Sequence, residues 1–95
     1  KGRGPVDFKV SSGYKDKTLV EIKLTTNPQL VHGLEKQIDE YGKAEETKNL
    51  IYLVIHNGGS QRRIDKMNKL YESKNSKNIK LIFINALPKD SASKF

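Results

Sequence analysis

The chain has 95 residues, of which 35% are hydrophobic, so it fits one small domain with a modest core. No apolar run approaches the roughly 20 residues that a membrane-spanning helix needs, so we expect no membrane partner. The absence of cysteine excludes disulfides and thiolate–zinc sites, and any metal must be held by oxygen or imidazole ligands. The first residues carry no apolar stretch typical of a secretory signal, and an intracellular, cytoplasmic protein is expected.

The charge balance points to the class of partner. Eighteen Lys and Arg against eleven Asp and Glu give a formal net charge of +7. Such an excess on a small surface favours a polyanion, nucleic acid before an anionic membrane. On charge alone, a lysine-rich surface that only confers solubility is an equally weighted alternative.

Two alternating segments open the chain. Residues 5–10 and 18–24 each alternate apolar and polar side chains, which predicts two strands. Residues 11–17 between them contain Gly13 and Asp16 and predict a hairpin loop, so the strands should pair antiparallel.

The remaining segments predict two helices and two further strands. Asn27 and Pro28 mark the start of a helix that extends to about Thr47, and Ser60 can cap a second helix. Residues 49–55 form an almost unbroken apolar run, which predicts a central strand covered on both faces, and residues 79–84 predict a last strand. The order β-β-α-β-α-β predicts an α/β fold in which helices flank a mixed β-sheet.

Polar side chains on the first two strands form a candidate site. Side chains alternate across a strand, so Glu21 and Lys23 share a face, and Asp7 lies opposite its apolar neighbours on the first strand. If the hairpin register aligns the apolar faces, these three side chains cluster. The Asp7 and Glu21 carboxylates, with the backbone carbonyl of Ile22, suit Mg²⁺, for which Mn²⁺ can substitute. The cation would activate water and offset phosphate charge, while Lys23 would assist deprotonation or stabilise the transition state.

An ordinary amphipathic hairpin explains the same pattern. In that alternative, Lys9, Glu21 and Lys23 form solvated cross-strand ion pairs that contribute little to stability. The following helix favours a site instead, because Gln37 and Tyr41 are four residues apart and share the face of its apolar residues. A glutamine on that face needs a hydrogen-bonding partner, unless it reaches solvent at the boundary of the core.

Three segments together resemble a known family. Gly4-Pro5-Val6-Asp7-Phe8, Val20-Glu21-Ile22-Lys23-Leu24 and Gln37-Ile38-Asp39-Glu40-Tyr41 resemble, in this order, the PD-(D/E)XK nuclease superfamily. The Gln-x-x-x-Tyr element is similar to the branch that contains RecB-type nucleases and phage exonucleases. The resemblance covers residues 4–41 and implies a restriction-endonuclease-like core.

The resemblance also implies roles for individual residues. Asp7 and Glu21 would be metal ligands, Lys23 the catalytic lysine, and Gln37 and Tyr41 would lie beside the scissile phosphate or support the metal ligands. Members of the superfamily usually open with a helix and a further strand that do not precede Lys1. We therefore expect residues 1–87 to be the C-terminal nuclease-like part of a longer protein, followed by a flexible tail over residues 88–95.

A basic stripe runs along the second helix. Arg62, Lys66 and Lys69 lie opposite its apolar residues, and such a stripe can follow a phosphate backbone. A solvated helix face is the alternative. His32 and His56 have no second histidine at ligand spacing, and we interpret both as structural or solvent-facing.

These observations lead to one main hypothesis and two alternatives. The first is a Mg²⁺-dependent deoxyribonuclease that hydrolyses phosphodiester bonds, with DNA before RNA as its substrate and endo- or exonucleolytic action left open. The second is a catalytically inactive nucleic-acid-binding or assembly module with a nuclease-like fold, and the third is an α/β interaction domain. A homo-oligomer or an upstream domain of the same chain would be a further partner.

Overall fold

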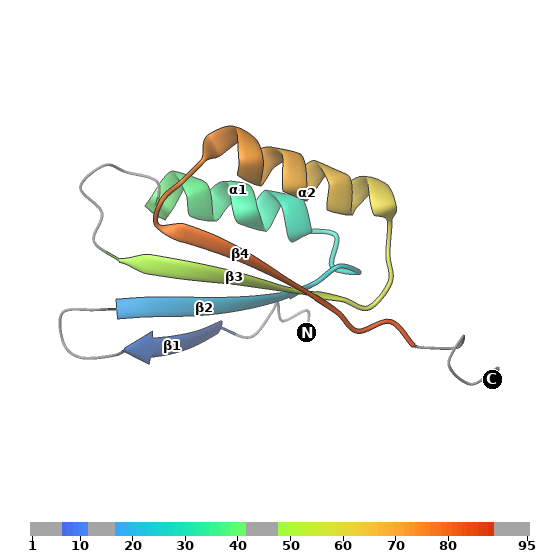
Figure 1. The fold of residues 1–95 in the computed structure, drawn as a ribbon, viewed down its shortest axis with the longest axis horizontal. Helices are drawn as coiled ribbons and strands as arrows, with labels where there is room; N and C mark the ends of the chain where they lie inside the picture. Colours follow the sequence, from blue (N-terminus) through green and yellow to red (C-terminus); the bar gives the residue numbers. More distant parts are fainter. Residues whose placement is uncertain (1–6, 12–16, 42–47, 89–95) are drawn as a thin grey trace.

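A computed structural model describes residues 7–11, 17–41 and 48–88, with side chains described from residue 18 onward. The elements follow the predicted order (Figure 1): β1 Asp7–Ser11, β2 Lys17–Leu24, α1 Leu30–Tyr41, β3 Asn49–His56, α2 Gln61–Lys74 and β4 Ile79–Asn85. The predicted extension of the first helix to Thr47 and most of the predicted tail lie outside the described residues.

The four strands form one mixed sheet in the order β1-β2-β3-β4. β1 pairs antiparallel with β2, as the hairpin pattern predicted, while β2, β3 and β4 are parallel. A helix connects each parallel pair, and both connections advance across the sheet in the same direction. Since such crossovers are right-handed, both helices are expected on one face of the sheet, and Figure 1 shows them there.

The core lies between this face and the two helices. β3 contributes every second residue to it, Leu50, Tyr52 and Val54, and all three are buried. The remaining buried apolar residues come from α1, α2 and the start of β4: Leu30, Leu34, Ile38, Ile64, Met67 and Ile79. The side chains on the other face of β3 are only half-buried. The prediction that both faces of this strand are covered is therefore correct, among the described residues, only for the face under the helices.

The faces of β2 are unusual for an amphipathic strand. Its charged residues Glu21 and Lys23 lie on the side that the helices cover and are buried. Its apolar residues lie on the other side, where Ile22 is half-buried and Leu24 is exposed. Because successive side chains of a strand point to opposite faces, β2 places two charged side chains in the core layer.

Side-chain hydrogen bonds to the backbone precede both helices. The Asn27 side-chain oxygen accepts a hydrogen bond from the Gln29 backbone N–H at 2.8 Å, just before α1. Ser60 is the N-cap of α2, as predicted, and its hydroxyl accepts from the Arg63 backbone N–H at 3.3 Å. Neither of these two described helices has the length and apolar character to cross a bilayer.

Candidate active site

Glu21 and Lys23 form a buried ion pair beneath α1. Each residue is 6% exposed, and the Lys23 Nζ atom lies 3.6 Å from Glu21 Oε2. A solvated pair on the surface of a hairpin would be largely exposed. The alternative of an ordinary amphipathic hairpin with solvated charges is therefore wrong for these two residues.

The register of the hairpin places position 7 directly across from Glu21. Asp7 and Glu21 are paired Cα positions of β1 and β2. Directly opposite positions of an antiparallel pair lie on the same face of the sheet, about 4.5–5.5 Å apart at Cβ. The backbone thus brings positions 7, 21 and 23 to one face, whereas the side chain of Asp7 lies outside the described residues.

Gln37 of α1 completes the described part of the cluster. Its side-chain Nε2 donates a hydrogen bond to Glu21 Oε1 at 2.7 Å. Its Oε1 atom is buried and has no hydrogen-bond donor among the described residues. A buried amide oxygen without a donor loses the free energy of its hydration, which marks a position where a further ligand would be favourable.

Tyr52 of β3 closes the cluster on the side of the core. It pairs with Glu21 in the parallel register, is fully buried, and donates its hydroxyl to the Leu30 carbonyl oxygen at 2.8 Å. Burial, and in second place the negative charge of Glu21, raises the pKa of the Tyr52 hydroxyl far above its usual range. Tyr52 therefore stays protonated and acts as a hydrogen-bond donor.

Gly33 makes the close approach of α1 possible. A β-carbon at this position would lie 2.6 Å from the Tyr52 hydroxyl oxygen, 2.8 Å from Lys23 Cε and 3.1 Å from Lys23 Nζ. These distances are shorter than van der Waals contact, so no larger residue fits without displacing a neighbour. The glycine thereby lets the Lys23 ammonium group lie directly under the helix.

Tyr41 and Ile22 are the other described residues that the sequence predicted for the site. Tyr41, at the end of α1, is half-buried and packs at the margin of the apolar core. Ile22 lies between the paired charges with its side chain on the opposite face of the sheet. The structure therefore brings Glu21, Lys23 and Gln37 into contact and leaves Tyr41 beside the core.

The available donor atoms are compatible with a hard cation. Glu21 offers a carboxylate and Gln37 a buried oxygen to which no described residue donates, and oxygen is the ligand type that Mg²⁺ prefers. Within the described residues, no group of three or more His, Cys, Asp or Glu side chains is arranged to hold a metal. A metal site here thus requires the Asp7 carboxylate in addition to Glu21.

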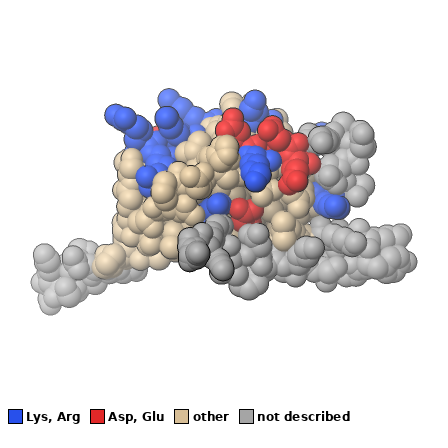
Figure 2. All heavy atoms as spheres, turned by 180° about the vertical axis from the view of Figure 1, so that it is seen from behind, with Lys and Arg blue, Asp and Glu red and all other residues tan. Residues whose placement is uncertain are grey.

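The three basic residues of the predicted stripe are all exposed on α2. Arg62 and Lys66 line a hollow between the two helices, and Lys69 lies one turn further along the same helix. In Figure 2, Lys and Arg gather at one end of the helical layer, and most of the acidic side chains in that view lie away from this end. The positive charge of the protein is therefore unevenly distributed over the helices.

Both histidines have the environments expected from the sequence. His32 is solvent-facing and lies 3.7 Å from Glu35. His56 is half-buried at the end of β3, where its ring lies against Phe83 and its Nδ1 atom is 3.0 Å from the Thr25 hydroxyl. Thr25 is fully buried and also bonds the backbone of the loop after β3.

Sequence reasoning missed Gly33 and Tyr52. A glycine within a helix lowers its stability by about 1 kcal/mol relative to alanine, so Gly33 signals a close approach to another element. A tyrosine within the apolar run of residues 49–55 needs a partner for its hydroxyl, which was the available signal for Tyr52.

Comparison with known protein families identifies a match over part of the chain. The family model described as Domain of unknown function (DUF8371) matches residues 1–59, which include β1, β2, α1 and β3. No curated protein and no solved structure matches the chain. The matched segment contains every residue of the buried cluster.

Proposed function

Since this chain belongs to the family of Domain of unknown function (DUF8371), whose description names no activity, we propose its function from the site. The protein is a Mg²⁺-dependent nuclease that hydrolyses phosphodiester bonds of DNA, on a restriction-endonuclease-like core of the PD-(D/E)XK type. The observation that carries this proposal is the buried cluster of Glu21, Lys23 and Gln37.

The energetic cost of this cluster supports a functional role. Two charges removed from water lose several kcal/mol of hydration each, and well-packed apolar residues at such positions are often as stabilising or more so. This chain nevertheless places a carboxylate, an ammonium group and an amide in its core layer, and one amide oxygen has no donor among the described residues. Such arrangements are typical of sites whose charges serve chemistry.

Each residue has a distinct role in the proposed reaction. Asp7 and Glu21, with the Ile22 carbonyl, would hold the Mg²⁺ ion, which when bound supplies positive charge to the phosphate and lowers the pKa of water. Gln37 orients the Glu21 carboxylate through their 2.7 Å hydrogen bond. The Lys23 ammonium group stabilises negative charge that develops on the phosphate, or takes part in proton transfer from the attacking water.

Substrate attraction is assigned to the basic residues on α2. Arg62, Lys66 and Lys69 are exposed, and the net charge of +7 favours association with DNA. The acidic site then serves metal binding and chemistry rather than affinity. Binding should consequently weaken steeply with salt and should survive the loss of Glu21.

The test is a digestion series on plasmid and linear duplex DNA with Mg²⁺ or Mn²⁺, using the full-length protein. Lys23→Ala should lower the cleavage rate by about 100-fold or more while DNA affinity stays nearly unchanged, because its contacts strengthen in the transition state. Lys80→Ala, at an exposed lysine of β4, is the matched control and should cleave normally. Circular dichroism of each variant establishes that it is folded.

Two results would contradict the assignment. Cleavage by Lys23→Ala at the wild-type rate would remove the catalytic role of this lysine. Wild-type protein that is folded and binds DNA, but is inactive with both metals, would favour the second candidate, a nucleic-acid-binding module with a nuclease-like fold. The exposed basic stripe lies on α2, an element that contributes no residue to the carboxylate site, and is the observation that supports this second candidate.

A further inference from the structure

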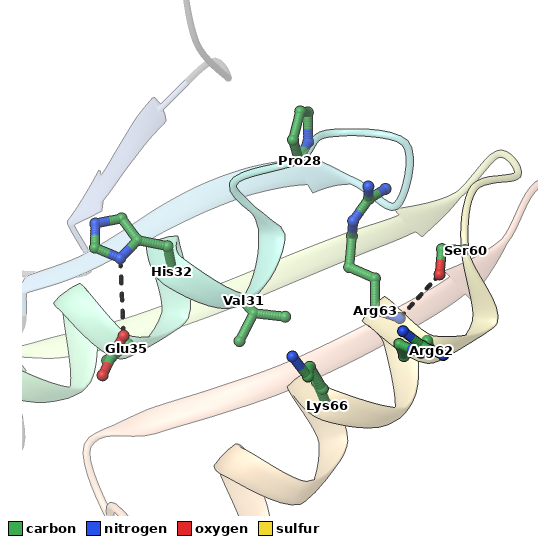
Figure 3. Close-up of a pocket in the computed structure, with 8 residues that line it drawn as sticks. All are labelled: Pro28, Val31, His32, Glu35, Ser60, Arg62, Arg63 and Lys66. Atoms are coloured by element: carbon green, nitrogen blue, oxygen red, sulfur yellow. Dashed lines mark hydrogen bonds and ion pairs between the residues drawn. The ribbon is translucent and has the colours of Figure 1, made fainter.

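A hollow of about 370 Å³ lies between α1 and α2. Its walls come from the loop before α1, from α1 itself and from the first two turns of α2 (Figure 3): Pro28, Val31, His32, Glu35, Ser60, Arg62, Arg63 and Lys66. This volume falls within the range of small-molecule pockets, about 300–1,000 Å³. The proposed nuclease chemistry uses none of these side chains for metal binding or catalysis.

The cationic side chains of the hollow are not neutralised by the described acidic residues. Arg62 and Lys66 form no ion pair in the part of the chain that the structure describes. Arg63 donates one hydrogen bond, from Nη1 to the Thr25 carbonyl oxygen at 2.9 Å, and carries no carboxylate partner there either. The lining thus holds three cations against one carboxylate, Glu35, and an excess of positive charge on a concave surface attracts an anion more strongly than the same charges on a convex surface.

The two acidic groups closest in sequence, Glu35 and Asp65, form no ion pair with these cations among the described residues. Glu35 faces His32, and in Figure 3 this pair lies at the far edge of the hollow from Arg62. Asp65 accepts a hydrogen bond from the Gln61 side chain at 3.1 Å. The positive side of the hollow is therefore the α2 side, where Ser60 adds a hydroxyl group.

The α1 side of the hollow carries two apolar residues beside the His32–Glu35 pair. Pro28 and Val31 form the opposite wall, and Figure 3 shows the Val31 side chain and the end of Lys66 directed toward one another across the gap. A ligand that fits both walls needs an anionic group on one side and an apolar or weakly polar body on the other. A sugar phosphate has this division.

We propose that the hollow between α1 and α2 binds one nucleotide unit, with its phosphate on Arg62 and Lys66 and its sugar on Pro28 and Val31. The source of this unit is a nucleic-acid strand, and in this respect alone the inference rests on the proposed function. A free nucleotide offers the same chemistry, and the experiment distinguishes the two.

The hollow is separate from the carboxylate site. On α1, successive residues are about 100° apart around the axis. Gly33 and Gln37 therefore lie on one flank of the buried face and Val31 and Glu35 on the other, with Leu34 between them. A strand bound in the hollow thus contacts the protein at a phosphate other than the one beside Glu21.

The first measurement is a nuclear magnetic resonance titration of the ¹⁵N-labelled protein, without divalent metal so that no cleavage takes place. Three probes are added in turn: inorganic phosphate, deoxyadenosine monophosphate and a short oligonucleotide. We expect the oligonucleotide to shift the backbone amide signals of Val31 and of residues 60–63 at the lowest concentration. Stronger shifts from the mononucleotide than from the oligonucleotide would overturn the assignment to a strand in favour of a free nucleotide.

The second measurement uses paired variants with equal charge. Arg62→Gln combined with Lys66→Gln should weaken oligonucleotide binding at least about tenfold and lower the salt slope by about one to two. Lys74→Gln combined with Lys77→Gln removes the same charge at the far end of α2 and should have a clearly smaller effect. All four substituted positions are exposed, and glutamine is a good helix former at the three that lie in α2, so both double variants should fold.

The outcomes separate this inference from the nuclease proposal. Equal weakening by both double variants, or no amide shifts around the hollow with any probe, would overturn the nucleotide site whether or not the protein cleaves DNA. Shifts confined to the hollow in a protein that proves inactive would leave the site standing and reject the nuclease.

Discussion

Gly33 of α1 and Tyr52 of β3 are packed so closely that a β-carbon on the glycine would lie 2.6 Å from the tyrosine hydroxyl oxygen. The hydroxyl cannot easily move away, because Tyr52 is fully buried and bonded to the Leu30 carbonyl. The contact holds α1 against the sheet at the place where Glu21 and Lys23 are buried.

Gly33→Ala should therefore destabilise the protein although alanine is the better helix former. Helix propensity favours alanine by about 1 kcal/mol, whereas forcing an extra carbon into a packed interior costs about 1–3 kcal/mol. We expect a net loss that urea denaturation detects as a lower midpoint. Lys36→Ala, on the exposed face of α1, should change stability by less than about 0.5 kcal/mol.

A double-mutant cycle identifies the cause of this loss. The Tyr52→Phe substitution removes the oxygen atom that the new methyl group of Gly33→Ala would meet first. The loss of unfolding free energy in the double variant should therefore be smaller than the sum of the losses in the two single variants. Strict additivity would show that the hydroxyl is not the obstacle.

Tyr52→Phe should also change the response of stability to alkaline pH. The pKa of this hydroxyl is raised in the folded protein, whereas in the unfolded chain it is about 10. Its contribution to the free energy of unfolding is therefore complete below pH 10 and is lost progressively as the pH rises above that value. The variant should lose about 1 kcal/mol at neutral pH and then decline less steeply above about pH 10.

Tyr71→Phe is the matched control for this measurement, because the Tyr71 hydroxyl also bonds a backbone carbonyl, that of Ile79 at 3.0 Å. Both variants and the wild type are unfolded in urea at several pH values. The same alkaline slope in Tyr52→Phe as in the wild type would contradict the role assigned to the buried hydroxyl.

Divalent metal should stabilise the protein through Glu21. A ligand that binds only the folded state adds about 2.7 kcal/mol when present at 100 times its dissociation constant. Thermal unfolding with rising Mg²⁺ should therefore show an increasing Tm in the wild type and little change in Glu21→Gln, which keeps the shape of the side chain without its charge. Glu35→Gln, an exposed carboxylate of α1, should respond like the wild type. An unchanged metal response in Glu21→Gln would remove this residue from the metal site.

Thr25 offers a test of the loops at the carboxyl ends of β2 and β3. Its hydroxyl donates to the Gly58 carbonyl at 2.5 Å and accepts from the Asn57 backbone N–H at 3.1 Å. Thr25→Val keeps the shape but leaves both backbone groups without this partner, which costs about 1–3 kcal/mol. Thr25→Ser keeps the hydroxyl and loses one methyl group, at about 0.8 kcal/mol. Chemical denaturation should rank valine below serine, and the reverse order would contradict the hydrogen-bonding role.

The sequence was sufficient to predict the order of the elements and three members of the buried cluster, Glu21, Lys23 and Gln37. Alternation on β2 placed Glu21 and Lys23 on one face, and helical spacing placed Gln37 on the side of α1 that meets it. These predictions depend on local geometry, because the periods of strands and helices determine which side chains share a face.

The face of β2 that the helices cover could not be predicted from its own pattern. Alternation alone favours burial of Ile22 and Leu24, yet the helices lie over Glu21 and Lys23. Which face of β2 the helices cover depends on the handedness of the crossovers and on how α1 packs across β3. The contact between Gly33 and Tyr52 was missed for the same reason, since it joins residues of different elements whose separation only the tertiary structure determines.

The bonds around Thr25 have a consequence for the order in which the protein opens. Its backbone N–H donates to the Ile55 carbonyl, its own carbonyl accepts from Arg63, and its hydroxyl holds the loop that leads into α2. The entrances to both helices are therefore joined through one residue, and neither can detach without breaking the same bonds. In native-state hydrogen exchange, the amides of Thr25, Asn57 and Arg63 should become exposed together, as one cooperative unit with a common opening free energy.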